Sequence, residues 1–375
     1  MSRKGVLNIH RSERGVQMEK RFRRAPRVLL AAGLMAISIA VAASVAVAKT
    51  TANKPCTPSN PITLGQPGLP PVFLGVRAYT ADKQGFYAKY CANVTIKQFT
   101  TGTDALRAVQ AGQIDAAWAP TPTALASIAK GADLVGIEGM DVVDWEVGSI
   151  DPSIKTCADL KGQTIGVDTV GGARYLALDG MLSKCKLSLS DVKTVNFPGA
   201  AAMQAMIAGS LKISVLHIDE EAQINKLRSQ DVTVQVKLTD VDPYQHYDML
   251  VVQRASLKAH YYDYLKMLAG DIAATRYMND PKNLDTVASI GTITGVSQDI
   301  AKGALSKYIK MHWWPLDNPG LGQSRVTRTI GLNVKLGNIP NGAVTWKGVV
   351  DTRMWKAAYT LVTGKKYIAK AAKAG

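Results

Sequence analysis

Histidine, cysteine and phenylalanine are scarce in this chain of 375 residues, which holds five His, four Cys and five Phe. Histidine and cysteine are the usual zinc ligands, and no Cys-x-x-Cys pair is present to hold that metal. Charged residues make up only 20% of the chain and hydrophobic residues 47%, which excludes a disordered chain. Only one stretch is apolar for about 20 residues, so a membrane protein with several spans is also excluded.

Patterns of nucleophilic or nucleotide-dependent catalysis are missing too. No Ser/His/Asp or Cys/His set can be recognised, and the sequence lacks the phosphate-binding pattern Gly-x-x-x-x-Gly-Lys-Ser/Thr. We therefore predict no catalytic residue, no metal and no cofactor. The formal net charge is +16, but the basic residues are scattered along the chain. We therefore expect no nucleic-acid partner.

The first 48 residues have the order of an export signal. They hold nine basic residues against two acidic ones, then an apolar run from Val28 to Val45, then Ala46-Val47-Ala48. This order predicts a signal peptide over 1–48, cleaved after Ala48, with Met18 as an alternative true start. An uncleaved membrane anchor is the other interpretation, because the apolar run is long. Export would place the mature chain in the periplasm, where disulfides form.

Short β-branched runs alternate with helical runs through most of the remaining chain. The predicted strands are 62–65, 94–99, 114–119, 134–137, 164–167, 192–196, 213–216, 232–236 and 249–252. The predicted helices are 72–90, 103–110 (capped by Thr103-Asp104), 123–130, 171–182, 200–208, 220–228, 257–279, 284–290, 297–312 and 349–361. This alternation predicts an α/β fold with mostly parallel sheets.

A weak internal repeat relates two parts of the chain. Shifting the sequence by 97 positions superposes the pattern around Ala111-Gly112 on the pattern around Ala208-Gly209. Any two strand–helix units look somewhat alike, which is the alternative explanation. We predict two similar lobes: lobe I from 54–142 plus 249–375, and lobe II from 143–248, joined by two hinge crossings.

The four cysteines allow three pairings. We predict Cys56–Cys91 and Cys157–Cys185. In each pair the first cysteine precedes a predicted strand, and the second ends the helix that returns to the start of that strand. Free buried thiols are the alternative.

Five loops follow predicted strands at the edge where open α/β sheets bind ligands, next to helix N-termini. These loops are 65–68, 100–103, 119–122, 168–175 and 197–200. Glycine and threonine in them leave backbone N–H groups and hydroxyls free for an anion or a polar ligand. Each loop taken alone could be an ordinary tight turn.

Three segments resemble a known family: FYAKYCANVTIKQFTTGTDALRAVQAGQIDAAWAP, ADLKGQTIGVDTVGGARYLALDGML and FPGAAAMQAMIAG. They are similar to the substrate-binding proteins of the nitrate/sulfonate/taurine ABC importers, including binders of thiamine-pyrimidine precursors. The resemblance covers roughly 60–255 and implies a type II periplasmic binding protein fold. It implies a monomer whose two lobes close on a small organic solute or anion and then dock on an ABC permease. The alternatives are an enzyme on the same two-lobed fold and a ligand sensor for a membrane kinase.

Helix N-termini face the ligand in this family, and three positions match them: Gly102-Thr103, Gly171-Gly172-Ala173 and Gly199-Ala200. The ligand-binding residues that we predict are Gln66, Pro67, Gly102, Thr103, Pro120, Thr121, Thr169, Gly171, Gly172, Ala173, Arg174, Gly199, Ala200, His217 and Glu220. Sulfonate binders often carry Ser or Thr where Gly171 and Gly172 stand. A bulkier or heteroaromatic ligand is therefore a candidate beside a sulfonate, taurine or nitrate.

Two further groups of residues have a structural and a functional interpretation. His217, Asp219, Glu220 and Glu221 follow a predicted buried strand, and helix capping is favoured over ligand contact, with a metal disfavoured. Trp118, Trp145, Trp313 and Trp314 could stack on a ring-shaped ligand, but core packing is favoured.

Overall fold

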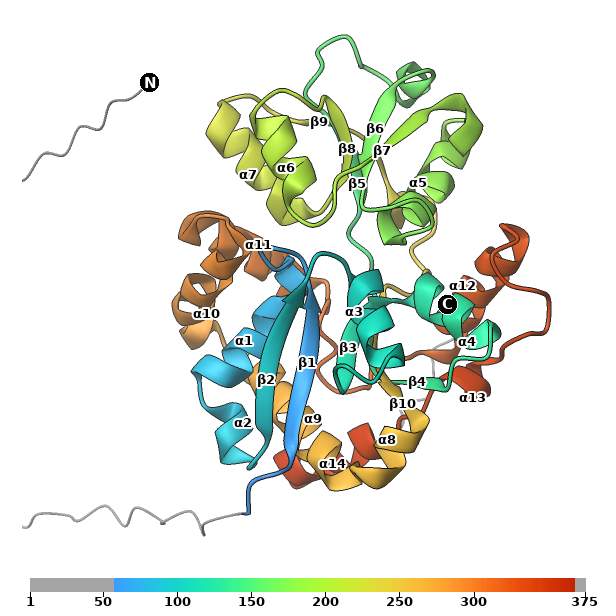
Figure 1. Cartoon of the computed structure of the whole chain (residues 1–375). Helices are drawn as coiled ribbons and strands as arrows, with labels where there is room; N and C mark the ends of the chain where they lie inside the picture. Colours follow the sequence, from blue (N-terminus) through green and yellow to red (C-terminus); the bar gives the residue numbers. More distant parts are fainter. Residues whose placement is uncertain (1–56, 368–375) are drawn as a thin grey trace, which may run out of the picture. The chain divides into compact units, whose positions relative to one another are not determined.

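The computed structural model describes residues 57–367 (Figure 1). The first of two five-stranded sheets has the order β2-β1-β3-β10-β4. Its strands are β1 (Pro61–Pro67), β2 (Asn93–Phe99), β3 (Ala116–Pro120), β4 (Leu134–Met140) and β10 (Asp248–Gln253). β1 pairs in parallel with β2 and β3, whereas β10 runs antiparallel to both of its neighbours.

The second sheet repeats this arrangement with the order β7-β6-β8-β5-β9. Its strands are β5 (Glu146–Ser149), β6 (Thr164–Val167), β7 (Lys193–Asn196), β8 (Ile213–Leu216) and β9 (Thr233–Lys237). β5 is the antiparallel strand here, paired with β8 and β9. The two sheets therefore share one topology, and the predicted α/β class with mostly parallel strands is confirmed.

Three helices accompany the second sheet: α5 (Ala173–Lys184), α6 (Ala201–Ile207) and α7 (Ile218–Arg228). The other helices lie around the first sheet (Figure 1). They are α1 (Val76–Lys83), α2 (Phe86–Lys89), α3 (Gly102–Gln110), α4 (Thr121–Ala129), α8 (Arg254–Ala259), α9 (Tyr261–Met278), α10 (Leu284–Gly291), α11 (Gln298–Lys310), α12 (Gln323–Lys335), α13 (Trp346–Val349) and α14 (Arg353–Thr363).

Four local predictions need correction. No strand was predicted over β5, and no helix was predicted over α12. The helix expected over 257–279 is divided into α8 and α9 at His260, whose φ of −116° and ψ of 34° are not helical. Finally, α3 is capped by Thr101 and not by Thr103-Asp104, because the Thr101 hydroxyl accepts a hydrogen bond from the backbone N–H of Asp104.

The chain crosses between the sheets twice, from β4 to β5 and from β9 back to β10. These crossings agree in number with the two predicted hinges, while the lobe boundaries at 142 and 248 remain a prediction.

One of the two predicted disulfides is present beside the second sheet. Cys157 and Cys185 are bonded, with their Cα atoms 5.5 Å apart and 28 positions apart in sequence. Closing a loop of this length stabilises the folded chain by about 3–4 kcal/mol. Cys91 is also disulfide-bonded; its predicted partner Cys56 lies outside the described residues.

None of the helices within 57–367 has both the length and the apolar character needed to cross a membrane. The predicted signal peptide over 1–48 lies outside the described part of the chain.

Candidate functional site

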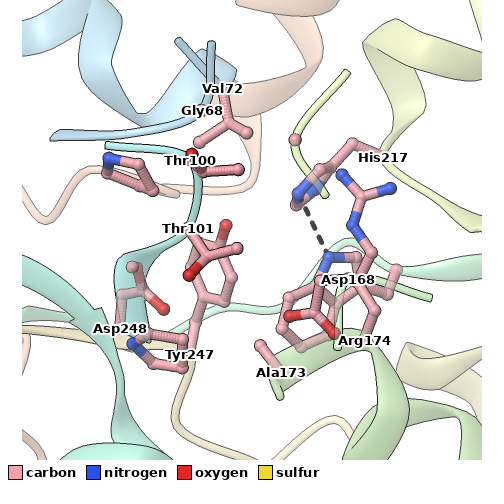
Figure 2. Close-up of a pocket in the computed structure, with 15 residues that line it drawn as sticks. Gly68, Val72, Thr100, Thr101, Asp168, Ala173, Arg174, His217, Tyr247 and Asp248 are labelled. Carbon is pink, nitrogen blue, oxygen red and sulfur yellow. Dashed lines mark hydrogen bonds between the residues drawn. The ribbon is translucent and has the colours of Figure 1, made fainter. Parts of the chain in front are cut away.

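A pocket lies where the strand ends of the two sheets approach each other (Figure 2). The first sheet contributes Pro67, Gly68, Thr100, Thr101, Gly102, Pro120, Tyr247 and Asp248, and the second contributes Trp145, Asp168, Ala173, Arg174, Gly199 and His217. The cavity encloses about 50 Å³, which is room for about four water molecules.

Sheet topology explains why these residues meet. The parallel strands β1, β2 and β3 end at one edge of the first sheet, and the antiparallel strand β10 begins at that edge with Asp248. The same holds in the second sheet, where β6 and β8 end at the edge at which β5 begins, just after Trp145. Ligands bind at this edge of open α/β sheets, so the pocket has the expected location.

Seven of the predicted ligand-binding residues line this pocket: Pro67, Gly102, Pro120, Ala173, Arg174, Gly199 and His217. Four others, Thr103, Thr169, Gly171 and Gly172, line a neighbouring cavity of about 250 Å³ that shares Thr101 with the first. Ala200 and Glu220 line another small cavity, which shares His217 with the first. Gln66 and Thr121 are fully buried. Ligand contact by these residues remains a prediction.

The Asp168 carboxylate lies beside the N-terminus of α5, which is predicted to face the ligand. It accepts a hydrogen bond from the backbone N–H of Thr169 at 2.8 Å. A Cβ atom at position 172 would lie 2.6 Å from both carboxylate oxygens. Gly172 therefore makes room for this carboxylate. Burial raises the pKa of Asp168, while hydrogen bonding to the neighbouring backbone lowers it by less.

Arg174 is already paired with a carboxylate. Its two terminal nitrogens donate to the two oxygens of Glu220 at 2.9 Å, and one of them also donates to the Val215 carbonyl at 2.8 Å. Both side chains are buried, so the ion pair is shielded from solvent. Glu220 also accepts from the backbone N–H of His217 at 2.9 Å, and it caps α7 as the sequence indicated.

His217 has a hydrogen-bond partner on each ring nitrogen. Its Nδ1 lies 2.8 Å from an Asp144 carboxylate oxygen, and its Nε2 accepts the indole N–H of Trp145 at 3.1 Å, the dashed line in Figure 2. Burial lowers the pKa of His217, but Asp144 and Glu220 raise it, and the net shift is upward. Protonation of Nε2 would nevertheless break the Trp145 hydrogen bond, because two donors would then face each other.

Asp248 is the least satisfied polar group in the pocket. It is 3% exposed, and its Oδ1 has no hydrogen-bond partner within residues 57–367. Burial raises the pKa of Asp248 to about 8, with repulsion from Asp168 adding to it and His217 opposing it. In Figure 2 Asp248 and Asp168 lie on opposite sides of the pocket.

Aromatic rings complete the wall, and their roles differ from residue to residue. Trp145 and Tyr247 line the pocket and contact each other edge-on with ring centroids 5.0 Å apart. Trp118, Trp313 and Trp314 are buried in the core, as the packing interpretation predicted. Tyr247 and Asp248 are not among the predicted residues, because strand periodicity does not reveal that β10 runs antiparallel and begins at the ligand edge.

Comparison with known sequences decides the family. The sequence model of the family described as "NMT1/THI5 like" matches residues 74–281, more than half of the chain. The chain belongs to this family. The resemblance inferred from the sequence is thereby confirmed. Among curated proteins, none matches this chain.

Solved structures with the same fold are numerous, and three are informative. The alkanesulfonate-binding protein of Xanthomonas axonopodis pv. citri, bound to MOPS, has a TM-score of 0.65 at 16% identity, over 80% of this chain and 100% of that one. The periplasmic nitrate-binding protein of Synechocystis PCC 6803 has a TM-score of 0.69 at 13% identity, over 83% and 91%. The desulfurization enzyme DSZB has a TM-score of 0.57 at 13% identity, over 80% and 99%. These likenesses establish the periplasmic binding protein fold.

Proposed function

We propose that this NMT1/THI5-like protein is the solute-binding component of an ABC importer, and that it captures a small solute in the pocket between its two sheets. The observation that carries this proposal is the composition of the pocket wall. Strand ends and helix starts from both sheets contribute to one cavity, and two crossings of the chain connect the sheets. A solute that contacts both sides would favour the closed arrangement.

The similar structures support the same role. Two of them are named as binding proteins, one for alkanesulfonates and one for nitrate. A periplasmic location, a cleaved signal over 1–48, a monomeric state and delivery to a membrane permease belong to this proposal. The sulfonates, taurine, nitrate and heteroaromatic solutes expected from the sequence are its first candidate ligands.

We favour binding over catalysis because of the hydrogen bonding of His217. A general base needs a free ring nitrogen within reach of the substrate. Both nitrogens of His217 are engaged, by Asp144 and by Trp145, and His217 is the one histidine that lines the pocket. The desulfurization enzyme DSZB shares the fold, but fold alone does not carry its chemistry to this chain.

A thermal-shift screen with a blocked pocket tests the proposal. We expect at least one small solute to raise the melting temperature of the wild-type protein. Thr100 is exposed and lines the pocket, so Thr100→Trp should fill the cavity and abolish that shift. Thr286→Trp places the same bulk on an exposed position of α10 and should keep it. No shift with any solute, or a shift that survives in Thr100→Trp, would contradict the proposal.

A further inference from the structure

The pocket walls offer little to an anion. Arg174 and His217 are the only basic side chains among the residues that line the pocket. The Arg174 charge is neutralised by Glu220 through two hydrogen bonds of 2.9 Å, and His217 is occupied on both ring nitrogens. A bound oxyanion would therefore meet no unpaired positive charge on these walls.

The helix N-termini that could replace such a charge are also partly used. Glu220 caps α7, and the hydroxyl of Thr101 caps α3. The Asp168 carboxylate accepts the N–H of Thr169 in the loop before α5. A carboxylate beside a helix start repels a second anion. These three helix starts therefore offer less than an uncapped one to phosphates and sulfonates.

The acceptors, in contrast, are unsatisfied. Asp248 is nine-tenths or more buried, lines the pocket, and leaves Oδ1 without any hydrogen bond inside the described range. Asp168 faces it from the second sheet, and the two carboxyls are close enough to raise the pKa of Asp248. Leaving a buried carboxyl oxygen unpaired costs about 1–3 kcal/mol, a cost that a hydrogen-bond donor on the ligand would remove.

Aromatic faces next to carboxylates favour the same class of ligand. Trp145 and Tyr247 both line the cavity. A cation near an indole or phenol ring is attracted by the negative face of the ring, and this attraction grows when water is excluded. A cation beside Asp248 would favour the ionised form of this acid, so these carboxyl groups together with the aromatic rings suit a positively charged ligand with N–H groups.

We propose that the ligand is a small organic cation, an amine or amidine, whose N–H groups bridge Asp168 of the second sheet and Asp248 of the first. This inference rests on the proposed function and narrows the class of solute. The bridging contact would also couple binding to closure, because the two carboxylates belong to different sheets.

Calorimetric titration with matched small probes tests the inference. Methylguanidine and propylamine serve as cations, and nitrate and methanesulfonate as anions of similar size. We expect a cation to bind at least tenfold more tightly than either anion. Asp248→Asn, which keeps the size of the side chain, should weaken cation binding at least tenfold. Asp231→Asn removes a negative charge at an exposed position outside the pocket and should change the Kd less than twofold.

The outcomes separate this inference from the proposed function. An anion that binds more tightly than both cations, or cation binding that is unchanged in Asp248→Asn, overturns the inference and leaves the binding role standing. Failure of every probe and of every solute in the thermal screen overturns both. Asp168→Asn tests the carboxyl of the second sheet in the same way, and its melting curve shows whether the substitution has disturbed the fold.

Discussion

Three buried acids have raised pKa values, and desolvation is the largest cause for each. Burial raises the pKa of Asp248 to about 8 and that of Asp219 to about 6. Burial also raises the pKa of Glu146, on the neighbouring strand β5, to about 8, with repulsion from Glu221 contributing. These acids hold protons in the folded protein that the unfolded chain would release near pH 4.

This difference makes stability depend on pH with a definite sign. Because the folded state binds more protons between about pH 4 and pH 8, the free energy of unfolding should fall as pH rises through that window. For Asp248 the stabilising effect is complete below pH 4 and lost above pH 8. Asp248→Asn should therefore stabilise the ligand-free protein by about 1–3 kcal/mol at pH 9 and flatten the dependence.

Urea unfolding at pH 6 and pH 9 measures the effect. Asp231→Asn, at an exposed position, is the control and should keep the wild-type slope. Glu146 and Asp219 still titrate in Asp248→Asn, so some slope remains. Parallel curves for wild type and Asp248→Asn would show that Asp248 is ionised in the folded protein.

Sequence alone located the loops of the site better than its side chains. Gly102, Gly199 and Ala173 follow predicted strands, and all three line the pocket. The partner of Arg174 could not be predicted, because Glu220 is 46 positions from it in the sequence. Such pairings depend on tertiary distances that residue patterns do not contain.

At the scale of elements, α7 of the second sheet packs against α11, and one buried tyrosine connects them. The Tyr308 hydroxyl lies 2.8 Å from Asp144 and 2.7 Å from Asp219. The single hydroxyl proton is shared between the two carboxyls. Burial raises the pKa of Asp219 to about 6, and the Tyr308 hydrogen bond lowers it by less.

Removing that hydroxyl should favour the open arrangement. Tyr308→Phe loses a hydrogen bond to a charged group, which contributes about 1.5–3 kcal/mol. We expect the Kd for a solute found in the thermal screen to rise about tenfold or more. Calorimetry measures the Kd, and melting curves check that the variant is folded.

Two further variants serve as controls for Tyr308→Phe. Tyr277→Phe removes a hydroxyl that has no hydrogen-bond partner within 57–367, on a ring packed edge-on against Phe86, and should leave the Kd unchanged. Lys226→Ala breaks the exposed ion pair between α7 and Asp299, and its effect should stay within about twofold because solvent screens such pairs. An equal loss of affinity in all three variants would contradict a specific role for Tyr308.

The elements that sequence analysis missed share a physical cause. β5 has only four residues, one of them Gly148, so its strand character comes from pairing with β8 and β9. α12 contains Val, Thr, Ile and Gly331, which are poor helix formers, and its packing against α4 compensates. Short or weakly biased segments take their structure from neighbours, which a local pattern cannot show.

At the scale of the whole molecule, the equal strand orders of the two sheets explain the repeat seen in the sequence. Gly112 and Gly209, which the 97-residue shift superposes, both adopt a positive φ, +67° and +77°, in turns that lead to β3 and β8. These two strands occupy equivalent places, next to β1 and β6. The repeat is therefore structural, and it places two equivalent ligand edges in one pocket.

The two edges that form the pocket belong to different sheets, so the pocket can widen to admit a solute and close around it. The cavity holds about 50 Å³, and Tyr308 ties the two sides together beside it. We expect small-angle X-ray scattering to show a larger radius of gyration for the ligand-free chain than for the chain saturated with its solute. Thr100→Trp, which cannot bind the solute, should show no change on its addition, and Tyr308→Phe should start from a larger radius. Identical scattering with and without a bound solute would mean that the pocket fills without movement of the lobes. Lobe closure could then not be the signal by which the proposed permease recognises the loaded protein.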